Sequence, residues 1–385
     1  DFGNNSVIDS AVFFNAVLLS QRFDIDKCVL IGTKTSAWAT LLDIDLKNEG
    51  KYIDLYDQID KESDSAGITR TTLDKLEQSL EQIWGKKCKC FANEATITEE
   101  NVFEIISYYF DIVSREAEND VIIDITHAFR SMPVLLMTAI QFRDSLGNKK
   151  GNIEIIYGEF KEVGTSIVRY LHPVWKGIKI SQAAQDFFDK FEAQELKEHL
   201  VPYWLSGAKA IENFGMIIQN NMVLCLDETL NQLKNALQVY KTMDSPPSWL
   251  KPIALNIEKL HNNLTKPNTQ KERILAVADI LFERRLYGQA VTSLQLSYEA
   301  FLFEYYENEN YGSFDETQKL RRKFYKESSL GKELEKIHRL ARTRNMIAHG
   351  GMDSGIKGKP QPQNLPSQYN SYRSFLERLY KDLGA

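Results

Sequence analysis

The first 175 residues alternate between short apolar runs and longer stretches with helical periodicity. The apolar runs are rich in β-branched residues and have the length of strands, at 27–33, 88–92, 121–126, 152–160 and 165–171. Helices are expected at 7–20, at 69–84, after Thr98 and near Pro133. Strands that alternate with helices predict an α/β domain over residues 1–175, with a mostly parallel sheet covered by helices on both faces.

Strand patterns disappear from about residue 176 onward, and helical periodicity continues to the C-terminus. The pattern is interrupted by the turn MDSPPSWLKP (243–252), the polar loop TKPNTQ (265–270) and the Gly- and Pro-rich stretch 350–367. A closing helix is expected at 368–382. The sequence therefore predicts an all-α region over 176–385 after the α/β domain.

Composition narrows the function classes. The chain has 385 residues, 43% of them hydrophobic and 26% charged, as in soluble globular proteins. Its net charge of −6 argues against a general polyanion binder, so nucleic acid would need a local basic patch. No apolar run is long enough for a membrane helix, and the four cysteines form neither a disulfide framework nor a metal motif. We expect a cytoplasmic protein with reduced thiols and no metal.

Two polar loops follow predicted strands. The turn before the helix near Pro133 carries Asp124, Thr126, His127, Arg130 and Ser131. The turn GTKTSAW carries Gly32, Thr33, Lys34 and Ser36. Ligands of such sheets bind at the carboxyl ends of strands, and hydroxyls, Arg and a helix N-terminus suit a phosphate group.

These loops therefore predict a site for an anionic, nucleotide-like ligand. The alternative is structural: Asp124 and Thr126 cap the turn, and Arg130 forms a surface ion pair. Neither loop has a phosphate-binding or dinucleotide-binding glycine motif, so ATP hydrolysis and dinucleotide binding have no support.

The stretch RTRNMIAHGG (342–351) is a second candidate site. It reads as the end of a helix that Gly350 terminates, with His349 in the last turn, where the helix dipole favours the protonated imidazole. Such a histidine suits proton transfer when a ribose 2′-hydroxyl attacks phosphorus, and Arg344 suits the charge that develops there. A basic helix end without catalytic role is the alternative. Spacing alone decides neither this nor whether Arg342 takes the place of Arg344.

The two motifs together resemble one family. DITHAFRSMP (124–133) on an α/β domain, with RNMIAHG (344–350) on a helical region, resembles the CRISPR-associated CARF–HEPN ribonucleases of type III systems, the Csx and Csm accessory nucleases. The resemblance implies a Rossmann-like CARF domain over 1–175, connecting helices over 176–270 and a HEPN core over 271–385. It implies that Arg344, Asn345 and His349 are catalytic and that the two strand-end loops bind a cyclic oligoadenylate.

The resemblance also implies a mode of action. Two CARF domains of a homodimer bind the cyclic oligoadenylate activator, and the HEPN domains then cleave single-stranded RNA without metal, leaving a 2′,3′-cyclic phosphate. Members begin with a further strand, which we expect to precede Phe2. A non-catalytic cyclic-nucleotide sensor, and a CARF site that degrades its own activator, remain alternatives. The ring size of the activator is open.

Three further features of the helical region have structural interpretations. The aromatic run YEAFLFEYYEN (298–308) is expected to pack the core. Glu299 is expected at the surface, with orientation of the Arg344–His349 pair as the alternative. The basic run KLRRKFYK (319–326) is expected to be a solvated face, with guidance of RNA as the alternative.

Overall fold

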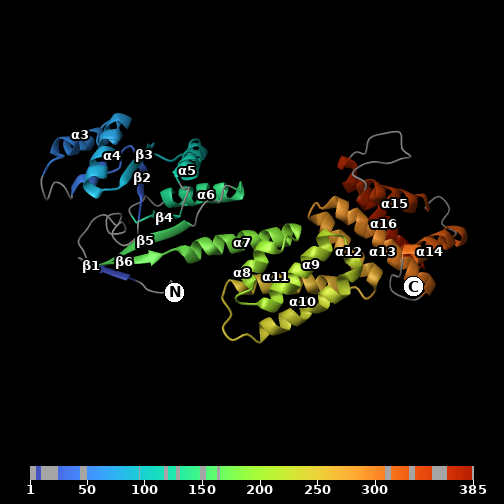
Figure 1. The fold of residues 1–385 in the computed structure, drawn as a ribbon. Helices are drawn as coiled ribbons and strands as arrows, with labels where there is room; N and C mark the ends of the chain where they lie inside the picture. Colours follow the sequence, from blue (N-terminus) through green and yellow to red (C-terminus); the bar gives the residue numbers. More distant parts are fainter. Residues whose placement is uncertain are drawn as a thin grey trace. The chain divides into compact units, whose positions relative to one another are not determined.

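The structure is a computed structural model that divides into two compact units, Asp1–Lys176 and Gly177–Ala385 (Figure 1). Each unit is described by itself. The described residues are 6–9, 25–43, 50–94, 96–116, 120–126, 131–147, 153–162, 165–307, 314–328, 334–348 and 362–383.

The first unit is an α/β fold, as predicted. Its strands pair as a two-stranded sheet and a four-stranded sheet of order β1-β6-β5-β4. Parallel pairs join β2 (Lys27–Thr33) to β3 (Lys87–Asn93) and β4 (Val121–Asp124) to β5 (Ile153–Glu162). The strands expected at 152–160 and 165–171 form an antiparallel hairpin of β5 and β6 (Thr165–Tyr170). Two residues separate them, which is too short for a parallel crossover.

The helix expected over 7–20 is wrong at its start. Ser6–Asp9 form strand β1, which pairs antiparallel with β6, so that Val7 lies opposite Ile167. Residues 10–24 lie outside the described part. A short apolar run fits a strand as well as a helix, and here the neighbouring strand supplies the backbone hydrogen bonds that decide between them.

Helices cover both faces of the β2–β3 pair (Figure 1). The helices of this unit are α3 (Ile53–Ser63), α4 (Arg70–Trp84), α5 (Val102–Glu116) and α6 (Ser131–Ser145), with a 3-10 turn at Trp38–Leu42. Cys28 and Leu30 of β2 face the α3–α4 side, whereas Val29 and Ile31 face α5 and α6. This alternation is that of a strand buried on both faces.

Local signals set the bounds of α4. The side chain of Thr69 accepts a hydrogen bond from the Thr72 N–H, which caps the helix start. Gly85 ends the helix with a φ of 65°, a conformation that glycine adopts at little cost. Leu73, Leu76 and the other apolar residues of one face are buried. The prediction of a helix at 69–84 is confirmed.

The second unit is all-helical. Its α-helices are α7 (His172–Lys190), α8 (Gln194–Leu200), α9 (Leu205–Gln219), α10 (Leu226–Lys241), α11 (Leu250–Thr265), α12 (Gln270–Glu283), α13 (Tyr287–Glu307), α14 (Phe314–Glu327), α15 (Leu334–Ala348) and α16 (Leu365–Leu383). The first five residues of α7, 172–176, belong to the first unit. None of the helices described here is long and apolar enough to cross a membrane.

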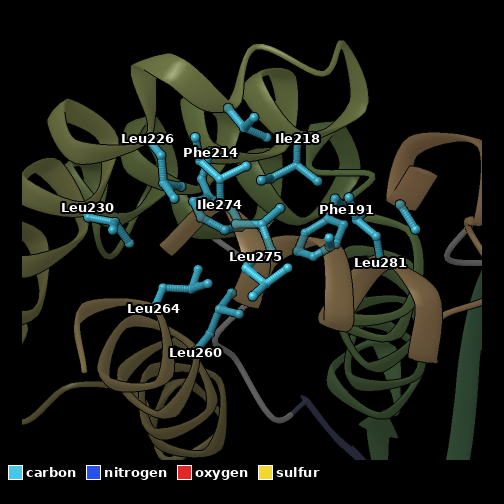
Figure 2. Packing of buried hydrophobic residues seen from close by; sticks show 14 of the residues in the cluster. Phe191, Phe214, Ile218, Leu226, Leu230, Leu260, Leu264, Ile274, Leu275 and Leu281 are labelled. Carbon is cyan, nitrogen blue, oxygen red and sulfur yellow. The ribbon is translucent and has the colours of Figure 1, made fainter. Parts of the chain in front are cut away.

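One hydrophobic core runs through this unit, from Ile180 to Tyr380. Figure 2 shows part of it, where Phe191, Phe214 and Ile274 converge from three segments of the chain. Tyr298 and Phe301 of α13 are fully buried, so the expectation that the aromatic run packs the core is confirmed for them. Residues before and after 270 therefore share one core.

Candidate functional site

The loop after β2 is closely packed on itself. The hydroxyls of Thr33 and Ser36 lie 3.0 Å apart, and Ser36 Oγ accepts the Thr33 N–H at 2.8 Å. The indole N–H of Trp38 donates to the Thr33 carbonyl at 2.7 Å. A Cβ on Gly32 would lie 2.7 Å from the Trp38 ring, so only glycine fits there. Thr33 is buried at the strand end, and its hydroxyl already has partners within the turn.

Lys34 continues this loop and is tied to the end of β3. Its N–H donates to the Asn93 carbonyl and its own carbonyl accepts the Ile68 N–H, both at 2.8 Å. Its ammonium group lies 2.5 Å from the Glu94 carboxylate, and both side chains are more than 40% exposed. An ion pair exposed to this degree contributes little to stability, so an incoming phosphate competes with Glu94 at small cost.

The loop after β4 shows the structural role that was the alternative for Asp124 and Thr126. One Asp124 carboxylate oxygen accepts the Thr126 N–H at 2.9 Å and also the Thr126 hydroxyl. Asp124 thereby closes a side-chain turn at the end of the strand. Ser131 is exposed and begins α6. His127 and Arg130 lie outside the described residues.

Tyr109 of α5 contacts both the end of β3 and the first turn of α6. Its hydroxyl lies 3.3 Å from Asn93 Oδ1 and 3.0 Å from Met132 Sδ. Asn93 is the register partner of Thr33, and Met132 is the second residue of α6. The end of β3 and the start of α6 therefore lie close together, beside the carboxyl end of the parallel β2–β3 pair, where such pairs bind ligands. Burial raises the pKa of Tyr109, so its hydroxyl remains protonated and able to donate.

The second candidate site lies at the end of α15. Thr343 is buried, and its hydroxyl lies 3.2 Å from the Tyr372 hydroxyl of α16, which sets the rotation of α15. With α15 in this rotation, the side chain of Arg344 is half-buried and that of Asn345 is exposed. His349 directly follows the last described residue of the helix and lies outside the described part.

Glu299 is not at the surface, so that expectation is wrong. It is 3% exposed, forms an ion pair with Arg321 of α14 and accepts the Gln295 side-chain amide at 2.9 Å. Helix α13 is buried around most of its circumference. Because polar and apolar positions of α13 are both buried, the pattern of its sequence does not indicate that Glu299 is buried.

Arg321 also changes the interpretation of the basic run 319–326. Its side chain is only 15% exposed, whereas the neighbouring Arg322 and Lys323 are exposed. Burial lowers the pKa of Arg321, and the positive charge of Arg344 lowers it further, while Tyr298 opposes both. Sequence reasoning missed Arg321 because one buried arginine in a basic run has no local signature.

The positive charges of Arg321 and Arg344 therefore repel one another, and Arg321 is paired with the buried carboxylate of Glu299. The carboxylate of Glu299 balances the charge of Arg321 and therefore does not also balance the charge of Arg344. A positive charge held near a half-buried surface is suited to a phosphodiester. Within the described ranges, no three His, Cys, Asp or Glu side chains are grouped as metal ligands.

Comparison with known proteins bears mainly on the first unit. Residues 3–160 match the family described as CRISPR system endoribonuclease Csx1, CARF domain. The CRISPR-associated protein MJ1674 of Methanocaldococcus jannaschii is 22% identical over 378 residues, which cover 90% of this chain. The chain spans 57% of the length of that relative.

A solved structure also aligns with the chain. Csm6 of Enterococcus italicus, bound to cyclic hexa-2′-fluoro-hexa-dAMP, is 10% identical, with coverage of 96% of this chain and 90% of that one. The TM-score is 0.29. The likeness of the first unit to a CARF domain therefore rests on the family match over residues 3–160.

Proposed function

We propose that the chain is a single-stranded RNA endoribonuclease activated by a cyclic oligoadenylate, because residues 3–160 match a CARF-domain family and the chain is similar to a CRISPR-associated protein. The activator binds at the loops after β2 and β4, and cleavage takes place at the end of α15. The observation that carries the proposal is the pair of arginines, Arg321 and Arg344, of which Arg321 alone has a buried carboxylate partner among the described residues.

The reaction follows from the groups that α15 presents. Arg344 binds a phosphodiester of the RNA and stabilises the charge that grows on its oxygens. His349 transfers protons as the 2′-hydroxyl attacks phosphorus and the 5′-oxygen leaves, with a 2′,3′-cyclic phosphate as product. Asn345, exposed beside Arg344, holds the RNA by hydrogen bonds. The groups that act are side chains, and no cofactor or metal takes part in these steps.

Activation requires that ligand binding at the first unit changes the second. A homodimer in which two CARF domains share one cyclic ligand fits the two-fold symmetry of such a ligand. The same dimer places two copies of the α15 site under control of one binding event, which is allostery between two distinct sites.

The test is cleavage of a fluorogenic RNA in the presence of cyclic oligoadenylates of three to six adenosines, with and without EDTA. We expect one ring size to activate cleavage, with no loss of rate in EDTA. His349→Ala and Arg344→Ala should abolish the signal. The matched controls His338→Ala and Arg339→Ala change exposed residues of the same helix and should retain it. Full cleavage by His349→Ala would refute the assignment of the reaction to this helix end.

A further inference from the structure

The helical unit has a groove that the proposed reaction does not use. Its volume is about 370 Å³, and it lies between α7, α11 and the end of α12. Its apolar lining residues are Phe188, Leu260 and Ile280. Pockets for small organic groups begin at roughly 300 Å³, so the groove has room for one nucleotide unit.

One face of α11 supplies polar side chains to the groove. Asn256, Lys259 and Asn263 are spaced by three and four residues, which places them on the same side of the helix, and all three are exposed. Asn256 donates one amide N–H to the Pro252 carbonyl at 3.0 Å and keeps its carbonyl oxygen for another partner. Lys259 forms no ion pair within the described part of the chain.

Arg284, directly after α12, brings a second positive charge. Its guanidinium lies 3.9 Å from the centre of the Phe191 ring, and one of its terminal nitrogens is buried without a hydrogen-bond partner among the described residues. Burial lowers the pKa of Arg284 to about 10, although Asp189 and Glu283 act in the opposite direction. The group stays protonated at neutral pH, and burying it without a hydrogen-bonded anion is costly. A negative charge in the groove would offset part of that cost through the electric field alone.

We propose that the groove binds one nucleotide of a single-stranded RNA. The base packs against the apolar lining residues, and the amides of Asn256 and Asn263 are able to form hydrogen bonds with the edge of the base. The phosphate lies between Lys259 and Arg284. The groove lining holds these two cations and the carboxylate of Glu283, and Asp189 acts on Arg284 from outside the lining. The inference rests on the proposed function, whose substrate is RNA.

The test is binding of a fluorescein-labelled single-stranded RNA, followed by anisotropy in the His349→Ala background, so that cleavage does not interfere. Lys259→Gln should weaken binding about tenfold and lower the slope of log K against log salt by about 0.7, as for one lost phosphate contact. Lys251→Gln changes an exposed lysine of the same helix outside the groove and serves as the control.

A second pair of variants tests the groove without removing a cation. Asn263→Asp places a carboxylate beside the proposed phosphate and should weaken RNA binding, whereas Asn262→Asp adds the same charge at the exposed neighbour and should not. Equal RNA affinities within both pairs would overturn the proposal, as would displacement of RNA by free AMP at equal molar concentration. Loss of binding in Lys259→Gln together with full cleavage by His349→Ala would instead refute the proposed function and leave the groove assignment standing.

Discussion

The buried pair of Glu299 and Arg321 allows a sharp test of the helical unit. Glu299→Met removes the carboxylate and leaves Arg321, whose side chain is 15% exposed, without its counter-ion. Breaking a buried ion pair from one side costs about 3–5 kcal/mol, and the small exposure of Arg321 places the expected cost near ~3 kcal/mol. A domain of this size loses about 2–4 °C of Tm per kcal/mol, so we expect a fall of about 6–12 °C.

We expect the stability of the unit to recover when both charges are removed. Glu299→Met with Arg321→Met should regain most of the lost stability, because an apolar pair of similar volume replaces the buried ions. Urea unfolding of both single variants and the double variant gives the coupling energy, expected at about 2 kcal/mol or more.

An exposed ion pair on α15 provides the control for this cycle. Glu335 and Arg339 are 62% and 65% exposed and lie one helical turn apart. The corresponding Met variants should change stability by about 0.5 kcal/mol or less. If Glu299→Met costs no more than Glu335→Met, or if the two losses at 299 and 321 simply add, the buried pair does not stabilise the unit.

Three further outcomes are expected from the first unit and the thiols. Arg130→Ala should raise the concentration of cyclic oligoadenylate needed for half-maximal RNA cleavage, and an unchanged activation curve would remove this loop from the binding site. Gly32→Ala should lower the free energy of unfolding by about 1–3 kcal/mol, because its Cβ would lie 2.7 Å from an indole ring; Gly177→Ala, which meets nothing within 4 Å in a helix, should stabilise by up to about 1 kcal/mol. Burial raises the pKa of Cys88 to about 12, so its thiolate fraction at pH 8 is about 10⁻⁴; an aromatic disulfide reagent should label the exposed Cys225 first and Cys88 only after unfolding.

Local patterns in the sequence determined much of the fold. The strand at 27–33 and the helix at 69–84 appear where the apolar spacing predicts them, and the Thr69 cap and Gly85 set the ends of the helix. These signals lie within a few residues of the backbone groups that they affect, so no distant partner is needed. The same holds for the change from alternating elements to continuous helices near residue 176.

Tertiary structure decided what depends on distant partners. Residues 6–9 became a strand because β6 supplies their hydrogen bonds, and Glu299 became buried because α13 is enclosed on most sides. Tyr109 contacts Asn93 and Met132, which are far apart in the chain, and the groove beside α11 is lined by residues from three helices. The sequence by itself determined which residues carry suitable chemistry. Only the packing of helices and strands decided which of them meet, because burial and charge compensation depend on neighbours that no local pattern names.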